Sequence, residues 1–221
     1  MKRIQTLIIL FFVTVTNVLS QDGIIPEIKD SAYLMTITRR SDKISMILGI
    51  ADTTKYLRVR NIIIRQYASL NDIQNTRDEK IRSVKTSANA GQEWLDEQMK
   101  VIKNEEIVSL YQLHFSFLAK LAAEISPEQL DLVKDGMTYG VLHHTYNGYL
   151  ALLPELTDEQ KRVIFSNLLE ARELAMDQGS SEDKHKVFGK YKGRINNYLS
   201  KEGYDLKKAE EQLKQKKTIQ D

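Results

Sequence analysis

The chain has 221 residues, of which 42% are hydrophobic and 28% are charged, and it contains three prolines and no cysteine. This length and composition suit a globular domain with a core of its own, and they exclude a disordered chain, a disulfide scaffold and cysteine-based metal or nucleophile chemistry. Few prolines and charges of mixed sign along the chain favour surface helices over a turn-rich β fold. We therefore predict an all-α protein.

The N-terminus has the pattern of a Sec-type signal peptide. Lys2 and Arg3 precede an almost wholly apolar run from Leu7 to Val15, and small or modest residues lead to Ser20. This pattern predicts a signal peptide over residues 1–20, with cleavage near Gln21. A single-pass anchor is the alternative, but the run is shorter than the roughly 20 residues that a membrane span needs. Without a cysteine there is no lipobox, so we expect a periplasmic or secreted protein with no stable membrane insertion.

Cleavage of the signal peptide changes the charge balance. The chain has 32 basic and 30 acidic residues, and both Lys2 and Arg3 lie in the signal peptide, which has no acid. The mature chain therefore keeps 30 of each sign and has no net charge. This balance does not favour a nucleic acid or an anionic membrane as a partner.

Apolar residues recur at helical spacing through the mature chain and predict a single bundle of about seven helices. We expect a helical domain over residues 21–204 and a charged C-terminal helix or tail over 205–221. The helices begin near Ser31, Asp52, Gln92, Ser126, Thr157, Ser180 and Asp205. Capping boxes are predicted at Ser126 and Thr157, because a glutamine follows each of them three residues later.

Two features of the long central helices allow more than one interpretation. The second helix carries several arginines beside its apolar stripe, which form either a solvated face or an anion-binding ridge: Arg58, Arg60, Arg65, Arg77 and Arg82. On the third helix, His114 lies next to the apolar stripe. A lone histidine in such a place is more typical of a packed side chain than of a ligand.

The segment from Asp135 to Tyr149 is unusual, because it combines three glycines, three tyrosines and two adjacent histidines. We interpret it as a shaped loop held between two helices, and loops on rigid scaffolds often carry function. Its candidate ligand-binding residues are Tyr139, His143, Tyr146, Asn147 and Tyr149.

The helix that begins near Ser180 contributes a second group of candidates: His185, Lys190, Tyr191, Arg194 and Asn197. Gly189 and Gly193 lie four residues apart, so they share one helix face where another backbone or a ligand could come close. The alternative is that the tyrosines of both segments pack helices together.

The runs DGMTYGVL, TYNGYL, LTDEQK and FGKYKGRINNYLSKEGYDLKKA resemble a family of secreted bacterial proteins catalogued as domain of unknown function 3826 and described as sugar-binding. The resemblance spans nearly all of the mature chain and is densest from Asp135 to Ala209. It implies an exported protein of polysaccharide-degrading bacteria. The family has no established catalytic residue that could be assigned here.

We therefore expect an exported carbohydrate-binding or accessory protein in polysaccharide utilisation. Sugars are held by aromatic rings against their C–H faces and by a few polar groups that bond their hydroxyls. If the glycan is acidic, as in plants, Arg194 and the neighbouring lysines could pair with its carboxylates.

Two other function classes stay open. The first is a lyase or hydrolase acting on acidic oligosaccharides. A hydrolase would use two facing carboxylates, for which the sequence offers Asp135, Glu155, Glu170, Glu173 and Asp177, and a lyase would use a base such as His143 or His144 beside Arg194. No zinc-peptidase, serine-hydrolase or nucleotide-binding motif is present, so we assign no catalytic residue and expect no metal and no cofactor. The second is a periplasmic chaperone-like helical protein. The sequence leaves the glycan and the oligomeric state open.

Overall fold

The computed structural model of the protein describes residues 30–86 and 91–220, and within these ranges it contains eight α-helices and no strand. The predicted all-α fold is confirmed. The expected signal peptide lies outside the described residues. Within the described ranges, no helix is both long enough and apolar enough to cross a membrane.

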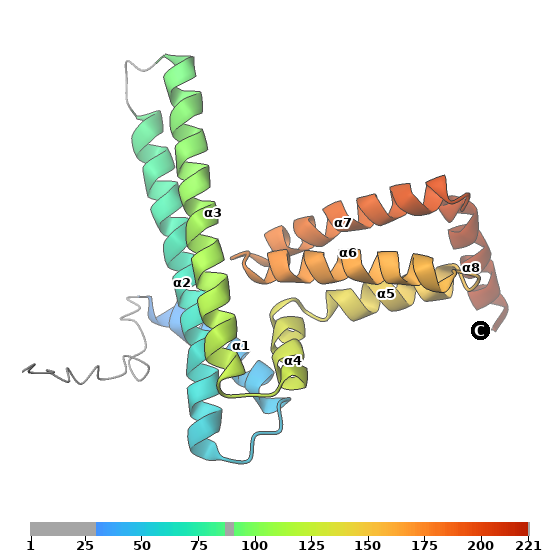
Figure 1. Cartoon of the computed structure of the whole chain (residues 1–221), viewed down its shortest axis with the longest axis horizontal. Coiled ribbons are helices and arrows are strands. Elements are labelled where there is room, and N and C mark those ends of the chain that lie inside the picture. The colour runs from blue at the N-terminus through green and yellow to red at the C-terminus, as the bar shows by residue number, and fades with distance from the viewer. Residues whose placement is uncertain (1–29, 87–90, 221) are drawn as a thin grey trace, which may run out of the picture.

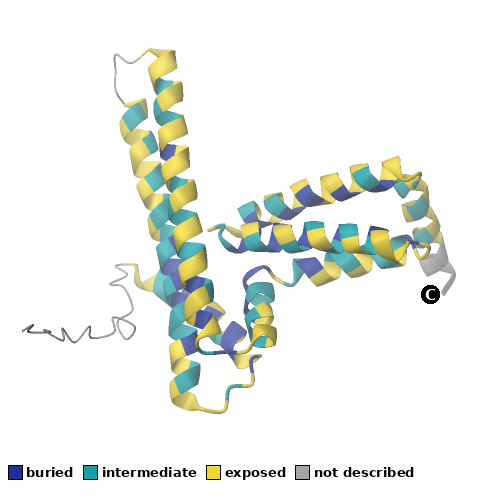
Figure 2. Cartoon of the chain, viewed as in Figure 1, coloured by how far each residue is buried: buried dark blue, intermediate teal, exposed yellow. Residues whose placement is uncertain are grey.

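The N-terminal half is built around a long helical hairpin (Figure 1). This half consists of α1 (Ser31–Met46), α2 (Thr53–Lys85), α3 (Gln92–Ala122) and α4 (Pro127–Met137). Helices α2 and α3 lie side by side, and α1 and α4 pack at one end of them. The far end of the hairpin stands clear of the rest of the chain, and most of its side chains are exposed (Figure 2).

The C-terminal half is a layer of helices that extends away from the hairpin (Figure 1). It consists of α5 (Val141–Leu152), α6 (Asp158–Met176), α7 (Ser181–Lys201) and α8 (Leu206–Gln220). Helices α5 and α7 both pack against α6, and α8 contacts α5 and α7. In the predicted tail, Leu206 and Ala209 pack against the other helices, so the start of α8 is not simply a solvated segment.

The helix starts follow the local sequence signals. Ser126 and Thr157 each form the predicted capping box. The hydroxyl of the cap residue accepts a hydrogen bond from the backbone N–H of a glutamine three residues later, and the side chain of that glutamine accepts one from the backbone N–H of the cap residue. Asp52 and Ser180 cap α2 and α7 with one side of this arrangement, because each side chain accepts a hydrogen bond from a backbone N–H of the first turn. Gly49, three residues after the end of α1, has a left-handed backbone with φ +64°, which is common just beyond a helix.

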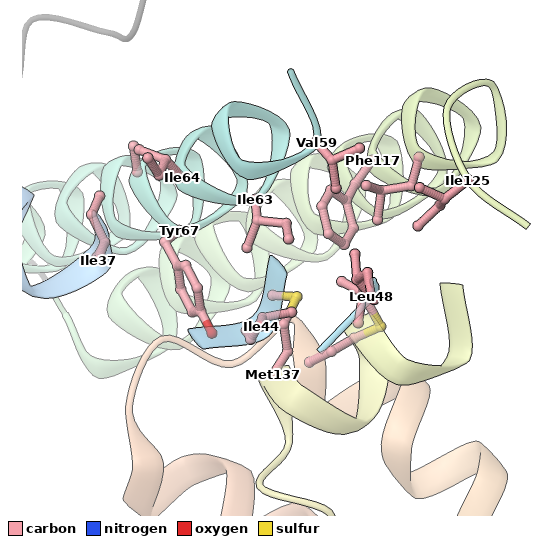
Figure 3. Close-up of a cluster of buried hydrophobic side chains, with 14 residues drawn as sticks. Ile37, Ile44, Leu48, Val59, Ile63, Ile64, Tyr67, Phe117, Ile125 and Met137 are labelled. Atoms are coloured by element: carbon pink, nitrogen blue, oxygen red, sulfur yellow. The ribbon is translucent and has the colours of Figure 1, made fainter. Parts of the chain in front are cut away.

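The buried apolar residues form two clusters. The first cluster joins α1 to α4 and includes Ile44, Ile63, Phe117 and Met137 (Figure 3). The second cluster joins α5 to α8 around Leu168, Phe188 and Ile195. Met176, the last residue of α6, is buried in the first cluster. It is the α6 side chain that carries apolar packing from one half to the other.

The prediction of a loop from Asp135 to Tyr149 is wrong, because most of this segment is helical. Helix α4 continues to Met137, a short turn follows, and α5 begins at Val141. In the turn, Tyr139 and Gly140 both have left-handed backbones, with φ of 59° and 65°. The buried residues Leu142 and Tyr149 lie seven positions apart, which is two helical turns. This spacing outweighs Gly148, which is exposed within the helix.

Candidate functional site

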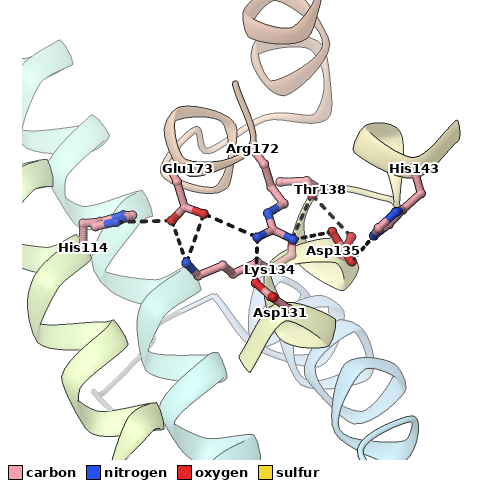
Figure 4. A network of polar contacts seen from close by, with 8 residues as sticks. All are labelled: His114, Asp131, Lys134, Asp135, Thr138, His143, Arg172 and Glu173. Carbon is pink, nitrogen blue, oxygen red and sulfur yellow. Dashed lines mark hydrogen bonds and ion pairs between the residues drawn. The ribbon is translucent and has the colours of Figure 1, made fainter. Parts of the chain in front are cut away.

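A chain of ion pairs connects the two halves (Figure 4). Arg172 of α6 is only 4% exposed. Its Nη1 donates to Asp135 Oδ1 at 2.9 Å and its Nη2 donates to Asp131 Oδ1 at 2.7 Å. One position along α6, Glu173 accepts two hydrogen bonds from Lys134 Nζ, at 3.0 and 2.9 Å. These contacts hold α4 against α6.

His114 of α3 lies at the end of this network, between two carboxylates. Its Nδ1 is 2.8 Å from Asp177 Oδ2, and its Nε2 is 3.6 Å from Glu173 Oε2. The hydrogen bond with Asp177 raises the pKa of His114, although burial opposes this. Burial raises the pKa of Asp177 in spite of the histidine. The pair therefore keeps a proton to higher pH than a free imidazole would.

Lys184 of α7 lies behind this pair and completes the end of α6. The residue is 2% exposed, and its Nζ donates to the carbonyl oxygens of Ala175 and Met176, both at 3.1 Å. The last carbonyls of a helix have no partner within the helix, so a lysine there is favourable. Burial lowers the pKa of Lys184 to about 8, partly offset by Asp177.

A cleft of about 290 Å³, which we call the α3–α6 cleft, opens beside His114. Its polar lining consists of His114, Glu173, Asp177 and Gln178, and its apolar lining of Ile107, Leu110, Tyr111, Phe115 and Leu174. The rings of Tyr111 and Phe115 are 5.8 Å apart, and each residue is 61% exposed. His114 meets Phe115 edge-on at 5.5 Å. The cleft thus combines two open rings with a fixed imidazole and two carboxylates.

The candidates from the segment around α5 are dispersed. Tyr139 is exposed, and its ring stacks on His185 of α7 with centroids 6.0 Å apart. His143 is exposed and hydrogen-bonds Asp135 Oδ2 at 2.9 Å. Tyr146 packs edge-on against Phe165 in a shallow hollow between α5 and α6. Asn147 is exposed and does not line the hollow at Tyr146.

The two predicted segments meet in two ways, through the exposed stack of Tyr139 on His185 and through the half of their tyrosines that is buried. Tyr149 is 7% exposed and its hydroxyl donates to Asn196 Oδ1 of α7 at 2.6 Å. Tyr191 is 2% exposed, with the guanidinium carbon of Arg194 4.5 Å from its ring centroid. Four cavities of the described residues, including the α3–α6 cleft and the hollow at Tyr146, have no lining residue from α7. We leave the two buried tyrosines out of the site that we propose.

The remaining candidates lie on the outer face of α7, where Lys190, Arg194 and Asn197 are exposed. A Cβ added at Gly189 or Gly193 would have no described protein atom within 4 Å. The expectation that another backbone approaches these glycines is therefore wrong. This part of α7 is an open surface rather than a packed one.

Comparison with known protein families gives one match. Residues 34–218 match the family model described as Protein of unknown function (DUF3826). The chain belongs to this family. The match begins in α1 and ends in α8, so the DUF3826 model covers the hairpin, the cleft and the second cluster together. No curated protein matches the sequence.

The α3 residues that line the α3–α6 cleft were not among the predicted site residues. We expected His114 to be a packed side chain, and the structure gives it two carboxylate neighbours. A signal was present in the sequence, because Val101, Val108 and Phe115 recur every seven residues on α3 outside its buried stripe. A second apolar stripe on one helix indicates a second surface that meets something else.

We predict that the contribution of His114 to stability depends on pH. A group whose pKa is raised in the folded state stabilises fully below its unfolded pKa, near 6.5, and loses this effect as pH rises through the folded pKa. The difference in unfolding free energy between wild type and His114→Asn should be larger at pH 6.5 than at pH 9. Urea denaturation at pH 6.5 and pH 9 measures this difference. Lys184 also titrates between these pH values, but it does so in both proteins, so comparison with the wild type removes its effect. An equal difference at both values would contradict the charged pair.

Proposed function

We propose that this DUF3826 protein is an exported carbohydrate-binding or accessory protein in polysaccharide utilisation, and that it binds sugar in the α3–α6 cleft. The observation that carries the proposal is the pair of open rings, Tyr111 and Phe115, beside the hydrogen-bonded His114 and Asp177. Exposed apolar patches rimmed by polar residues often mark binding sites.

The chemistry of the cleft suits a sugar. The rings offer apolar faces for the C–H groups of a pyranose, and the carboxylates and the amide of Gln178 can bond its hydroxyls. Both rings lie on one long helix and His114 is fixed by its hydrogen bond, so little ordering is required on binding. Two carboxylates and one imidazole favour a neutral or an amino sugar at this place over a uronate.

The acidic plant-type glycan that the sequence suggests would need a different surface. Lys190 and Arg194 on the exposed face of α7 carry the positive charge for it, and Arg194 is 3.9 Å from Glu170. The shallow hollow at Tyr146 is a third possible contact surface, with Lys161 and Arg162 in its lining. Binding at either of these surfaces would respond to different substitutions from binding in the cleft.

We expect the purified mature protein to bind at least one member of a panel of neutral, amino-sugar and uronate polysaccharides. Phe115→Ala and Tyr111→Ala should each weaken binding by about tenfold, because stacking on an aromatic ring contributes roughly 1 kcal/mol or more. Affinity electrophoresis screens the panel, and isothermal titration with oligosaccharides measures the constants.

Variants at the other surfaces serve as controls. Tyr146→Ala and Arg194→Ala leave the α3–α6 cleft intact, so binding in the cleft should be unchanged in both. If Tyr146→Ala alone abolishes binding, the sugar occupies the hollow between α5 and α6. If the panel shows no binding, or binding that none of the four changes alters, the carbohydrate proposal is wrong.

An enzyme acting on oligosaccharides is the second candidate, and the position of His114 favours it. An imidazole oriented by one carboxylate and close to another is a common arrangement for proton transfer. Chromatography of the same polysaccharides after incubation should then show new products, and His114→Asn should abolish them. If the polysaccharides are unchanged after incubation, the enzyme candidate is wrong and only the binding role is left.

A chaperone-like role would use the apolar side chains of α3 that continue beyond the cleft. Val101 and Val108 lie outside the cleft and are 42% and 55% exposed. Under this alternative, the protein slows aggregation of an unrelated unfolded protein, and Val108→Ser weakens the effect. Sugar binding would not respond to that substitution.

A further inference from the structure

The side of α3 that faces away from α2 carries a line of exposed apolar side chains. Its members are Trp94, Val101, Val108 and Phe115, and the least exposed of them, Val101, is 42% exposed. Each follows the last by seven residues, which is close to two helical turns, so the four lie along one face. Phe117, which packs with α2 in the first cluster, lies on nearly the opposite face. Single exposed apolar residues are common on soluble proteins, but a line of them along one helix indicates a surface that meets a partner.

The spacing of this line, which we call the free stripe of α3, indicates the shape of the partner. An α-helix has 3.6 residues per turn, so a stripe that repeats every seven residues drifts only slowly around the helix and can follow a second helix over its whole length. From Trp94 to Phe115 the stripe is about 32 Å long, at 1.5 Å per residue. A helix laid lengthwise along α3 would cover it.

The order of the residue types in the stripe favours a second copy of this chain as that helix. An aromatic residue stands at each end and a valine at each inner position, so the order is the same in both directions, and the centre lies next to Asn104. If two α3 helices run antiparallel about this centre, Trp94 of each copy faces Phe115 of the other. In the same arrangement Val101 faces Val108. Two-fold interfaces require such self-complementarity, since the same patch serves on both sides.

The acids that flank the stripe have partners in their own chain. Glu97 is 3.8 Å from Lys100, and Glu105 accepts a hydrogen bond from Lys80 of α2 at 2.8 Å. Asn104, at the centre, is exposed and carries no charge. These acids therefore do not set unpaired like charges against each other when two copies meet.

We propose that the free stripe of α3 is a self-association surface, on which two copies of this chain pair through antiparallel α3 helices. Helix α3 has 31 residues and is about 46 Å long, and a helix is about 10 Å wide, so the contact covers roughly 400 Å² of each copy. Stable complexes bury about 800 Å² per partner. The dimer should therefore be weak and reversible, with a dissociation constant of about 0.1 mM. Phe115 also lines the α3–α6 cleft, so dimerisation would cover this ring only at protein concentrations near that constant.

Sedimentation equilibrium of the purified mature chain tests the pairing, at protein concentrations from about 5 to about 500 µM and without sugar. The mean mass should rise with concentration from that of a monomer toward that of a dimer. Val108→Glu should raise the dissociation constant by at least about tenfold, because it places a charge in the apolar centre of the contact.

Ile47→Glu is the matched control for this substitution. Ile47 lies at the end of α1, away from the stripe, and is 56% exposed, against 55% for Val108. This variant should dimerise as the wild type does. Because both side chains are exposed, neither change should prevent folding.

The direction of the two helices can be tested separately, because the chain contains no cysteine. Asn104→Cys lies at the centre of an antiparallel pair, where the same residue of both copies meets, so oxidation should link two chains by a disulfide. Gln112→Cys is exposed on the same face but away from the centre, so an antiparallel pair should leave it unlinked. A parallel pair would link both.

The proposal fails if the protein stays monomeric over this range, or if Val108→Glu dimerises as tightly as Ile47→Glu. Equal linking of Gln112→Cys and Asn104→Cys would contradict the antiparallel arrangement. If the protein is monomeric but Val108→Glu loses the ability to slow aggregation of an unfolded protein, the stripe meets unfolded chains and the proposal is wrong. Because no sugar is present, these results do not bear on sugar binding in the α3–α6 cleft.

Discussion

Replacement of Arg172 by methionine should lower the free energy of unfolding by about 3 kcal/mol, because it leaves a carboxylate in the junction without its buried partner. Arg172 is 4% exposed and bonds Asp131 and Asp135, and the side chain of Asp135 is itself only 16% exposed. Methionine keeps the volume but supplies no charge. Urea denaturation followed by circular dichroism measures the change, which should appear as a lower midpoint.

Arg162→Met is the matched control, because Arg162 lies on the same helix and pairs with Glu159 at the exposed surface. Such surface pairs contribute little, so its effect should stay within about 0.5 kcal/mol. Arg172→Lys keeps the charge but cannot reach two carboxylates with one planar group, so it should fall between the two. If Arg172→Met were no more destabilising than Arg162→Met, the network would not hold the halves together.

Met176→Ala should also destabilise the protein by about 3 kcal/mol, since truncation of a buried methionine typically costs 2 to 5 kcal/mol. Met176 is fully buried and belongs to the first cluster, although the rest of α6 packs in the second. The cavity left behind would separate the two apolar clusters. We therefore expect a broader denaturation transition as well as a lower midpoint.

Met46→Ala controls for the chemistry of the substitution, because Met46 is 70% exposed at the end of α1. Its loss should change stability by less than about 0.5 kcal/mol. Equal effects of Met46→Ala and Met176→Ala would show that the apolar contact between the halves is unimportant.

The parts of the fold that depend on local sequence were predictable. Helix starts such as Ser126 and Thr157 are specified by side chains within three residues of the cap, and both have the expected geometry. The region of α5 was missed because Gly140 and Gly148 suggested a loop. Only one of them, Gly140, needs the freedom of glycine, and it lies in the turn before the helix.

The candidate site could not be predicted in the same way, because it is assembled from distant segments. His114 and Asp177 are 63 positions apart and meet only through the packing of the halves. The recurrence of Val101, Val108 and Phe115 indicates a second apolar stripe on α3, but it does not show whether that stripe is covered, since exposure depends on what lies opposite. The tyrosines of α5 and α7 have residue types suited to sugar binding, but tertiary packing buries Tyr149 and Tyr191.

The far end of the hairpin has a consequence for how this architecture can vary. In α2 the buried residues end at Leu70, and in α3 they begin at Ile102. All members of both clusters, the cleft and the ion pairs of α4 and α6 lie on the near side of these positions. The side chain of Gln74 still lies against Gly179 in the turn between α6 and α7. Equal numbers of whole turns could therefore be added to or removed from both helices beyond Gln74, so the hairpin can differ in reach while the rest of the molecule keeps its form.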